Sequence, residues 1–423
     1  MNLPATENVL YLDELRSLPT ECINRLLSEY GVSKRFDEDS DGWLHDLLAA
    51  HIGKRGKAIG QGSLQILPDG FGFLRNARSD YLSGPDDIYV SPSQIRKFDL
   101  RDGDVVAGNI RPPKDSERYF ALLRVEEVND NPPNGERIHF DDMEPFAPSD
   151  RIILESGAAL QATRLVDMFA PMGIGQRGIL VSPAGAGKTK LLQQVAKSVA
   201  TENGSIHVFV LLIDERPEDS TVWYREMEGT GVEVIQSDFG ESSSRHLDVA
   251  SMVFEKSCRM VESGQDAMVI VDSLTSLARI ELENLHPKKT TARDQEFASD
   301  DVNLDSLPWT RQQLALARNT NGFGSLSILA TLSNESNLEQ QICERLLPVA
   351  NTRIVLDEQL LQRRIWPAIN VFESGSDFDQ GVLGDDLELI NQMRNRLGKF
   401  DAAGAMDGLT TLLKDYPLSL IHI

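Results

Sequence analysis

The fold of this 423-residue chain is decided by the stretch Ile179-Leu180-Val181-Ser182-Pro183-Ala184-Gly185-Ala186-Gly187-Lys188-Thr189. Its apolar start reads as a strand ending at Val181, and the apolar spacing from Lys188 to Ala200 predicts a helix. Small residues between the two let backbone N–H groups converge on phosphate oxygens at the start of the helix. Lys188 adds a positive charge there, and the Thr189 hydroxyl is a ligand for Mg2+. The stretch therefore predicts a phosphate-binding loop.

Two further apolar runs end in carboxylates. Val210–Ile213 leads into Asp214 and Glu215, and Met268–Val271 leads into Asp272. In nucleotide-hydrolysing sheets, one carboxylate at the carboxyl end of a strand holds the metal through water, and another orients the attacking water. We expect Asp272 to serve the metal and Glu215 the water.

From about Ile152 onward, short strand-like runs alternate with longer helical ones, which is typical of βαβ units and a mostly parallel sheet. The strands that we expect are Ile179–Val181, Val208–Ile213, Val232–Ile235, Met268–Val271, Leu326–Ala330 and Ile354–Leu356. The helices that we expect are Lys188–Ala200, His246–Ser263 and Trp309–Asn319.

The first third of the chain has a different texture. From Val9 to about Ile52, apolar residues recur at helical spacing and predict three short helices. Between Ser63 and Val128, short apolar runs punctuated by Gly and Pro predict a small closed barrel. The polar, Pro-rich segment that follows, with Asn131-Pro132-Pro133-Asn134-Gly135 in it, reads as a connector.

Composition limits the classes of partner. Lys and Arg total 42 against 65 Asp and Glu, a formal net charge of −23, so a nucleic-acid site has to be local rather than a broad basic surface. Apolar runs such as Ala267–Val271 are too short to span a bilayer. The first residues lack the pattern of a secretion signal, and the three cysteines lie far apart. We expect a cytoplasmic protein with no membrane segment.

Several long motifs follow one another along the chain: Asp69–Arg75, Gly84–Arg96, Arg111–Lys114, Glu117–Leu123, Gly175–Gly178, the phosphate loop, Leu211–Glu218 and Pro367–Ile369. With these motifs in this order, the chain resembles the bacterial transcription termination factor Rho family over nearly its whole length. The resemblance implies a hexameric RNA-dependent ATPase and helicase with ATP and Mg2+ as cofactors. It also implies single-stranded pyrimidine-rich RNA and the RNA polymerase complex as partners.

The resemblance implies a multidomain fold. Residues 1–55 are expected to form a helical subdomain and residues 60–130 an OB-fold barrel of the cold-shock-like type that binds RNA. Residues 131–150 are expected to be a linker, and residues 151–423 an α/β RecA-like P-loop ATPase domain.

The resemblance also assigns site residues. The RNA site takes in Gly70, Phe71, Gly72, Phe73, Leu74, Arg75, Asp87, Ile88, Tyr89, Glu117, Arg118 and Tyr119. Exposed aromatics on a barrel can stack bases, and neighbouring charged groups can read base edges. The ATP site takes in Gly173, Gln176, Arg177, Gly178, Gly185, Ala186, Gly187, Lys188, Thr189, Lys190, Arg216 and Trp366, with Trp366 against the adenine. Arg364 matches an arginine that acts on a neighbouring subunit's nucleotide, and it joins Glu215 and Lys188 as a catalytic residue.

The departures from the family pattern lie in the motor. Gly185 stands where the family has Lys, and Asp377 stands at the arginine finger, whose loss can cost about 10³–10⁵ in rate. Acidic segments, Ala298–Asp301 and Ser333–Asn337, replace the two loops of the central pore, with Lys288, Lys289, Arg293 and Arg311 as the nearest cations.

Three interpretations therefore stay open. The first is an RNA-stimulated ATPase ring that terminates transcription. The second is a degenerate paralogue that binds RNA or ATP, translocates poorly, and regulates a competent Rho or joins it in a mixed ring. The third is a RecA-like ATPase that acts on protein or small molecules.

Overall fold

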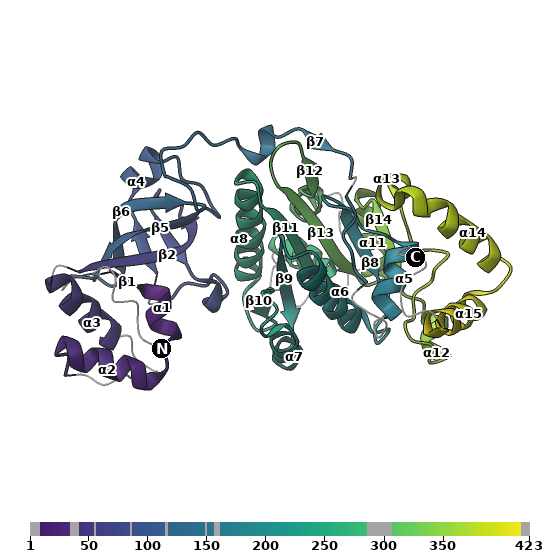
Figure 1. Ribbon diagram of the computed structural model, residues 1–423, viewed down its shortest axis with the longest axis horizontal. Coiled ribbons are helices and arrows are strands. Elements are labelled where there is room, and N and C mark those ends of the chain that lie inside the picture. The colour runs from purple at the N-terminus through teal and green to yellow at the C-terminus, as the bar shows by residue number, and fades with distance from the viewer. Residues whose placement is uncertain are drawn as a thin grey trace, which may run out of the picture. The chain divides into compact units, whose positions relative to one another are not determined.

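The computed structural model describes residues 9–33, 42–54, 56–84, 87–114, 117–148, 150–155, 161–285 and 307–415. It divides into two compact units, Met1–Ile138 and His139–Ile423, which we describe one at a time (Figure 1).

The first unit joins a helical subdomain to a barrel. Its elements are β1 (Val9–Tyr11), α1 (Leu12–Ser17), α2 (Thr20–Tyr30), α3 (Gly42–Gly53), β2 (Lys57–Ile66), β3 (Gly72–Arg75), β4 (Ile88–Val90), α4 (Pro92–Lys97), β5 (Val105–Arg111) and β6 (Phe120–Val128). Among the described residues, β2, β3, β4, β6 and β5 are hydrogen-bonded in that order, and β5 returns to β2, which closes the barrel.

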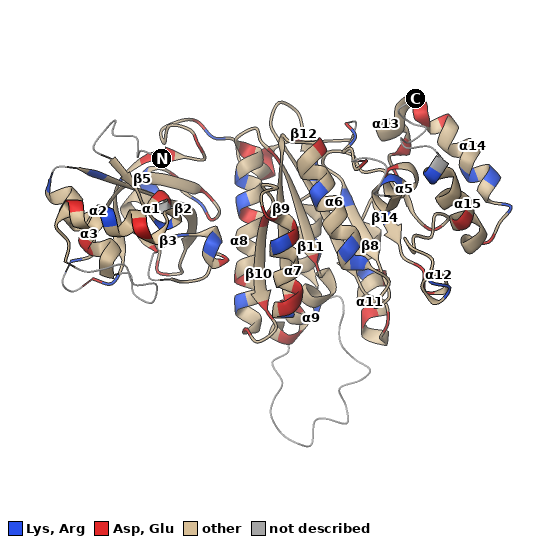
Figure 2. Cartoon of the chain, turned by 60° about the horizontal axis from the view of Figure 1, so that its bottom comes forward, with Lys and Arg blue, Asp and Glu red and all other residues tan. Residues whose placement is uncertain are grey.

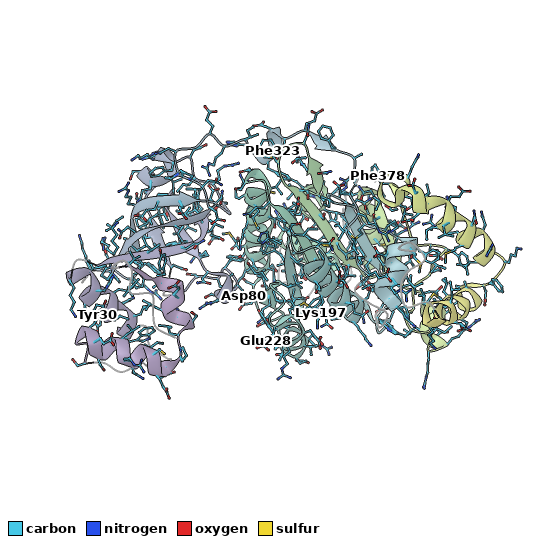
Figure 3. The ribbon with its side chains drawn as sticks, in the orientation of Figure 1. Tyr30, Asp80, Lys197, Glu228, Phe323 and Phe378 are labelled. Carbon is cyan, nitrogen blue, oxygen red and sulfur yellow. The ribbon has the colours of Figure 1, made fainter. Side chains whose placement is uncertain are left out.

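Local sequence explains how the helices of this unit end and begin. Gly31, with φ +75°, ends α2, and Ser91 starts α4 through reciprocal hydrogen bonds with Gln94. Tyr30, labelled in Figure 3, lies at the end of α2 and is hydrogen-bonded through its hydroxyl to His51 Nδ1 of α3 at 2.9 Å. Apolar faces of the three helices and the inward residues of the barrel share one core.

One expectation for this unit is wrong. Val9–Tyr11, which the apolar spacing assigned to a helix, is strand β1, which pairs in parallel with Lys57–Ile59 of β2. Three residues are too few to distinguish the helical period of 3.6 residues from the strand period of 2. The partner strand, β2, also lies far along the chain.

The second unit is an α/β domain. Its elements are β7 (Pro145–Phe146), α5 (Gln161–Phe169), β8 (Arg177–Val181), α6 (Lys188–Glu202), β9 (Ile206–Glu215), α7 (Pro217–Met227), β10 (Glu233–Asp238), α8 (Ser243–Glu262), β11 (Asp266–Asp272), α9 (Leu274–Leu285), α10 (Pro308–Ala315), β12 (Arg318–Thr320), β13 (Ser325–Leu332), α11 (Asn337–Leu346), β14 (Thr352–Val355), α12 (Glu358–Gln362), β15 (Gly375–Ser376), α13 (Asp379–Leu383), α14 (Leu387–Leu397) and α15 (Ala402–Asp415).

The central sheet has the order β10-β9-β11-β13-β8-β14-β15, and the strands from β10 to β14 are parallel (Figure 1). Alternate residues of β9, Val208 and Val210 among them, join one apolar core with Val195 of α6. The intervening residues Phe209, Leu211 and Ile213 are also buried, so helices cover both faces of the sheet. The order places β13 between the strand of the phosphate loop and the strand that ends in Asp272.

The helix expected over Trp309–Asn319 ends earlier than predicted. It stops at Ala315, because Arg318–Thr320 forms the short strand β12, which pairs with both β13 and β7.

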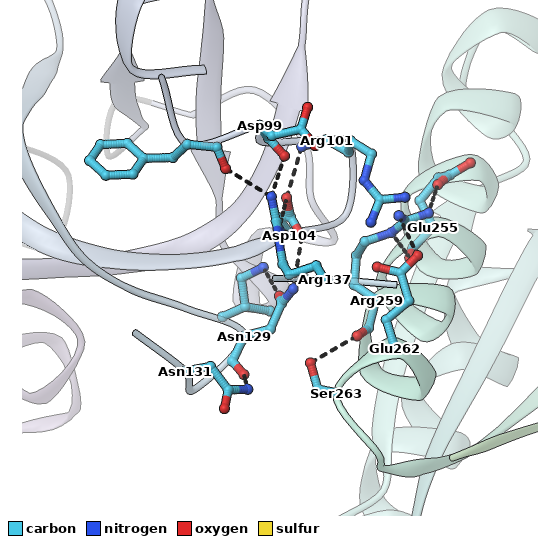
Figure 4. Close-up of polar contacts among 12 residues, drawn as sticks. Asp99, Arg101, Asp104, Asn129, Asn131, Arg137, Glu255, Arg259, Glu262 and Ser263 are labelled. Atoms are coloured by element: carbon cyan, nitrogen blue, oxygen red, sulfur yellow. Dashed lines mark hydrogen bonds and ion pairs between the residues drawn. The ribbon is translucent and has the colours of Figure 1, made fainter. Parts of the chain in front are cut away.

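The segment expected as a linker is held to a unit at each end. On the first unit, Arg137 makes an ion pair with the buried Asp104 at 2.9 Å, and Asn129 donates to the same carboxylate at 2.8 Å (Figure 4). On the second unit, Phe140 is buried and its N–H donates to Glu262 of α8 at 2.8 Å. Glu262 in turn accepts from Arg259 at 2.7 Å. The contacts of Arg137 hold the backbone before residue 138, and those of Phe140 hold the backbone after residue 139.

Charge of both signs is spread over helix surfaces such as that of α8 (Figure 2). In the part of the chain that the structure describes, no helix is both long and apolar enough to cross a membrane.

Candidate nucleotide and RNA sites

The predicted phosphate loop lies between β8 and α6 at the carboxyl edge of the sheet. Gly185 and Gly187 both have left-handed backbone, with φ of +71° and +86°, which favours glycine at these two positions. Ala186 is buried beneath the loop, while Lys188 and Thr189 begin α6 partly exposed. The loop therefore presents backbone N–H groups at a helix start, as an anion site needs.

Trp366 lies directly on this loop. A Cβ at Gly187 would come within 2.7 Å of Trp366 Cη2 and closer still to Cζ3, so the indole packs against the glycine backbone. The Lys190 ammonium lies 5.1 Å from the indole centroid. Since 37% of Trp366 is exposed, an indole face remains for a nucleotide base beside the phosphate loop. The structure thus brings Trp366 next to Gly187 and Lys190, although Trp366 is far from both in the sequence.

The cation of the loop is paired with the predicted metal carboxylate. Lys188 Nζ lies 2.6 Å from Asp272 Oδ1, and Thr331 Oγ1 of β13 donates to the same oxygen at 2.9 Å. Burial opposes the charge on Lys188, but attraction to Asp272, with smaller contributions from Glu215 and Asp219, raises its pKa above the ordinary value. Lys188 therefore stays charged at the start of α6.

Glu215 ends β9 at the same edge of the sheet. Burial first, and then repulsion by Asp272, raises the pKa of Glu215 to about 7. A carboxylate with a pKa near neutrality is suited to accept a proton from an attacking water. Arg216, the next residue, is exposed at the start of α7.

On the barrel, aromatic side chains gather on one side of β3 and β4. Ring centroids lie 5.8 Å apart for Phe71 and Phe73, 5.7 Å for Phe71 and Tyr89, and 4.8 Å for Phe73 and Tyr119. The Arg118 guanidinium lies 5.5 Å from the Tyr119 ring. Because Phe71, Tyr89 and Tyr119 are partly exposed, they offer ring faces on which bases can stack.

Alternation along β3 divides the predicted RNA residues into two sets. Leu74 and Ile88 point into the barrel core and are 2% and 1% exposed, so their side chains are not available to RNA. Phe73 and Arg75 lie on the other face. Arg75 makes a buried ion pair with Asp87 and donates to Gln65 at 3.0 Å, which fixes the guanidinium beneath the aromatic cluster. Two predicted positions remain. Gly70 lies in a turn with φ +83°, and Gly72 lies where strands pack too closely for a side chain.

A cavity of about 700 Å3 opens beside Tyr119 and Tyr89. Glu117 lines it and receives a hydrogen bond from Arg111 at 2.9 Å. That hydrogen bond, with a second from the Lys114 N–H, lowers the pKa of Glu117 to about 2. The cavity thus holds a fixed carboxylate as an acceptor next to two aromatic rings.

The comparisons with known proteins match both sites. Residues 60–134 match the family model described as Rho termination factor, RNA-binding domain, and residues 162–376 match ATP synthase alpha/beta family, nucleotide-binding domain. The chain is 43% identical to transcription termination factor Rho of Rhodopirellula baltica, over 96% of this chain and 79% of that protein. It is 39% identical to transcription termination factor Rho of Pseudomonas fluorescens, over 95% and 96%.

This chain belongs to the transcription termination factor Rho family. A solved structure described as a prototypical ATPase from the type III secretion system of pathogenic bacteria shares the fold, with a TM-score of 0.51 at 17% identity over 72% of this chain and 88% of that one. The expected fold class, a helical subdomain and an OB-like barrel before a RecA-like ATPase domain, is confirmed. As a Rho-family chain, it carries an RNA-binding domain and an ATPase domain.

The structure separates four predicted nucleotide residues of this Rho-family chain from its phosphate loop. Gly173, Gln176, Arg177 and Gly178 lie at the amino end of β8, whereas the loop follows its carboxyl end. Arg177 and Ser182 are therefore about 16 Å apart along an extended strand. Arg177 donates to Val349 and Ala317 carbonyls at 2.8 and 3.0 Å, so its guanidinium is used within the fold. These four residues are not part of the phosphate site of their own chain.

Instead, Gln176 lies next to Asp377, at the position where the resemblance expects an arginine finger. Gln176 Nε2 donates to Ser376 Oγ at 3.0 Å, and the following residue, Asp377, is exposed and donates its N–H to the Asn351 carbonyl at 2.9 Å. Asp377 lines a cavity of about 300 Å3 with Arg353, another exposed residue. Arg364 is exposed two residues before Trp366, in left-handed backbone with φ +56°.

Sequence reasoning missed one contact of the phosphate loop. Glu335, in the acidic segment expected to line a pore, accepts a hydrogen bond from the Ala184 N–H of the loop. No local pattern marks this residue, and only the strand order shows that it follows a strand next to β8. The other acidic segment, Ala298–Asp301, lies outside the described residues, as do Lys288, Lys289 and Arg293. Arg311 is exposed on α10.

Proposed function

We propose that the chain is an ATP-dependent transcription termination factor that binds nascent single-stranded RNA on its barrel and hydrolyses ATP in response. The observation that carries this proposal is the grouping of Lys188, Asp272 and Glu215 at one edge of the sheet, beside Trp366. A chain that only binds RNA has no use for a carboxylate of raised pKa next to a charged phosphate-loop lysine. The degenerate paralogue is therefore the less favoured alternative, although Asp377 is compatible with a slowed motor.

Each residue of the site has a task in hydrolysis. The loop N–H groups and Lys188 hold the phosphates, Trp366 stacks on the adenine, and Glu215 orients the attacking water and accepts its proton. Arg364, supplied by a neighbouring copy in a homohexameric ring, takes part of the role that Asp377 cannot perform. A mixed ring with another Rho is a variant of the same assembly.

Mg2+ fits the donor set. It takes oxygen ligands and is usually bound by one or two protein groups together with substrate phosphates. The Thr189 hydroxyl at the start of α6 and the buried Asp272 carboxylate, whose Oδ1 is already held by Lys188 and Thr331, are such oxygens. The described residues hold no group of three or more His, Cys, Asp or Glu side chains that could bind a metal ion. When bound with the nucleotide, the ion would neutralise charge that develops on the phosphates.

The barrel is proposed to select pyrimidine-rich RNA. Phe71, Phe73, Tyr89 and Tyr119 supply stacking, and Glu117 and Arg118 supply groups that can pair with base edges. This recognition is local, which agrees with a net charge of −23 that disfavours general attraction to RNA. We keep residues 1–55, 60–130, 131–150 and 151–423 as the working division into subdomain, barrel, linker and motor, and the cytoplasm as the place of action.

Release of transcripts from stalled elongation complexes of the same organism's RNA polymerase tests the proposal. The wild-type chain should release RNA in the presence of ATP, and Glu215→Gln should bind the transcript without releasing it. RNA release that is equal with and without ATP would contradict the proposal. Binding of the transcript without any release by the wild type would instead favour the degenerate paralogue.

A further inference from the structure

The hydrogen bond from Ala184 N–H to Glu335 Oε1 joins the phosphate loop to the segment after β13. The donor is a backbone group of the loop whose remaining N–H groups are the candidate phosphate ligands. The acceptor is a carboxylate, which resembles a phosphate oxygen in charge and in the hydrogen bonds it accepts. A carboxylate of the protein thus accepts a hydrogen bond from an N–H group at the edge of a candidate anion site.

Strand order places Glu335 after the strand that separates the phosphate loop from the candidate metal carboxylate. β13 lies between β8, which leads into the phosphate loop, and β11, which ends in Asp272. Thr331 of β13 contacts Asp272, and the Ser333 N–H donates to Thr275 Oγ1 of α9 at 2.9 Å. Trp366 follows β14 and α12, and α12 also lines the cavity beside Glu335. The segment after β13 therefore links the phosphate loop to the surroundings of Asp272.

The backbone that carries Glu335 is well held. Glu339 of α11 accepts hydrogen bonds from the N–H groups of Glu335 and Ser336 at 3.2 and 3.0 Å and from Ser333 Oγ at 3.1 Å. In return, Ser336 Oγ accepts from the Glu339 N–H at 3.2 Å. The turn at the start of α11 is therefore fixed, and the Glu335 side chain is the part free to change position.

Room for such a change exists beside the contact. A cavity of about 510 Å3 is lined by Pro183 and Ala184 of the loop, by Asn334 and Glu335, and by residues of α11 and α12. A carboxylate that leaves Ala184 can turn into this space and meet solvent there.

We propose that Glu335 competes with the terminal phosphate of ATP for the phosphate loop. This inference rests on the proposed function. The Glu335 carboxylate accepts the hydrogen bond from the Ala184 N–H when no terminal phosphate is near. ATP must displace this carboxylate, because its terminal phosphate competes for the same N–H and repels the negative charge. ADP, which lacks that phosphate, leaves the contact in place. The coupling is reciprocal: ATP moves the Glu335 side chain off the Ala184 N–H, and anything that draws this side chain away from the loop raises ATP affinity.

The test is calorimetric titration of the full chain with the non-hydrolysable ATP analogue AMP-PNP and with ADP, both with Mg2+. Glu335→Ala should bind AMP-PNP about tenfold more tightly, as expected for loss of one charge-assisted competitor, and ADP almost unchanged. Glu335→Gln, which keeps an acceptor but no charge, should fall between. The matched control is Glu358→Gln, which removes the same charge from the same cavity and contacts Gln362, not the loop.

Each outcome has a distinct meaning. Equal AMP-PNP affinity in wild type and Glu335→Ala overturns the competition and leaves the proposed function standing. Equal tightening of AMP-PNP and ADP, or the same effect from Glu358→Gln, also overturns it, because general electrostatics would then suffice. If neither the wild type nor Glu335→Ala binds either nucleotide, both proposals fail. Binding by Glu335→Ala alone supports the competition in its strongest form.

Discussion

Replacement of Gly187 by Ala tests the placement of Trp366 on the phosphate loop. The new Cβ would lie 2.7 Å from Trp366 Cη2 and 3.1 Å from Cε3, so the ring has to withdraw by roughly 1–2 Å to reach ordinary contact distance. Overpacking of this kind costs about 1–3 kcal/mol, and left-handed backbone in Ala adds about 1–2 kcal/mol. If both costs oppose nucleotide binding, they amount to about 2–5 kcal/mol, and the dissociation constant rises about 30-fold to several thousand-fold.

Gly185→Ala is the matched control. Gly185 has φ +71°, close to that of Gly187, but a Cβ there meets nothing within 4 Å. It therefore carries only the backbone cost of about 1–2 kcal/mol, at most roughly 30-fold in affinity. Calorimetry with AMP-PNP measures both variants, and thermal unfolding shows whether each folds.

Removal of the indole completes the design. In a Trp366→Ala background, Gly187→Ala and Gly185→Ala should weaken binding to a similar extent, because the specific clash is gone. Equal affinities of the two glycine variants in the wild-type background would refute the reasoning, since they would show that Trp366 does not press on the loop when nucleotide binds.

Three further predictions concern the RNA face, a buried ion pair and pH. Tyr119→Ala should weaken binding of a labelled cytidine-rich RNA, followed by fluorescence anisotropy, by about 1–3 kcal/mol and leave ATP binding without RNA unchanged; unchanged RNA affinity would remove Tyr119 from the site. Asp87→Ala leaves Arg75 buried without its carboxylate partner and should lower the free energy of unfolding by about 3–5 kcal/mol in urea titrations. The double variant Asp87→Leu with Arg75→Met should recover most of this lost stability. If the single and the double variant lose the same stability, the pairing is contradicted. The pKa of Glu215 is raised from 4.5 to about 7 in the folded chain, so the contribution of Glu215 to stability is complete below about pH 4.5 and is lost as pH rises through 7. Glu215→Gln should lose less stability than the wild type between about pH 5 and 8, and parallel losses in denaturation curves would show that Glu215 is not the group responsible.

The nucleotide site was the most predictable part of the chain. The loop from Ser182 to Thr189 is contiguous, and its strand and helix carry their own periodicities. Asp272 and Glu215 were found because carboxyl ends of parallel strands share an edge, which needs the class of sheet but not its strand order. The pairing of Lys188 with Asp272 follows from that shared edge.

Residues near the loop in sequence were less predictable in space. Gln176 and Arg177 precede the loop by only a few positions, yet an extended strand carries them to the opposite edge of the sheet. The family resemblance grouped them with the nucleotide without showing at which end of the strand they lie. Direction along a strand, rather than distance along the chain, decides which site a residue can join.

Contacts that depend on strand order were not accessible from sequence. Glu335 reads as an acid in a polar loop, and its contact with Ala184 exists because β13 was inserted between β11 and β8. The parallel pairing of Val9–Tyr11 with β2 was missed for the same reason, since both partners look ordinary by themselves. The aromatic cluster stands between these cases: the spacing of apolar runs placed Phe71 and Phe73 in a barrel, and the resemblance was needed to assign them to RNA.

The central claim is that RNA on the barrel drives hydrolysis at the phosphate loop, and ATP turnover with and without cytidine-rich single-stranded RNA tests it most directly. Glu215→Gln serves as the blank. The account predicts turnover by the wild type that rises with RNA and is absent in the variant. RNA binding without turnover above that of Glu215→Gln would contradict it.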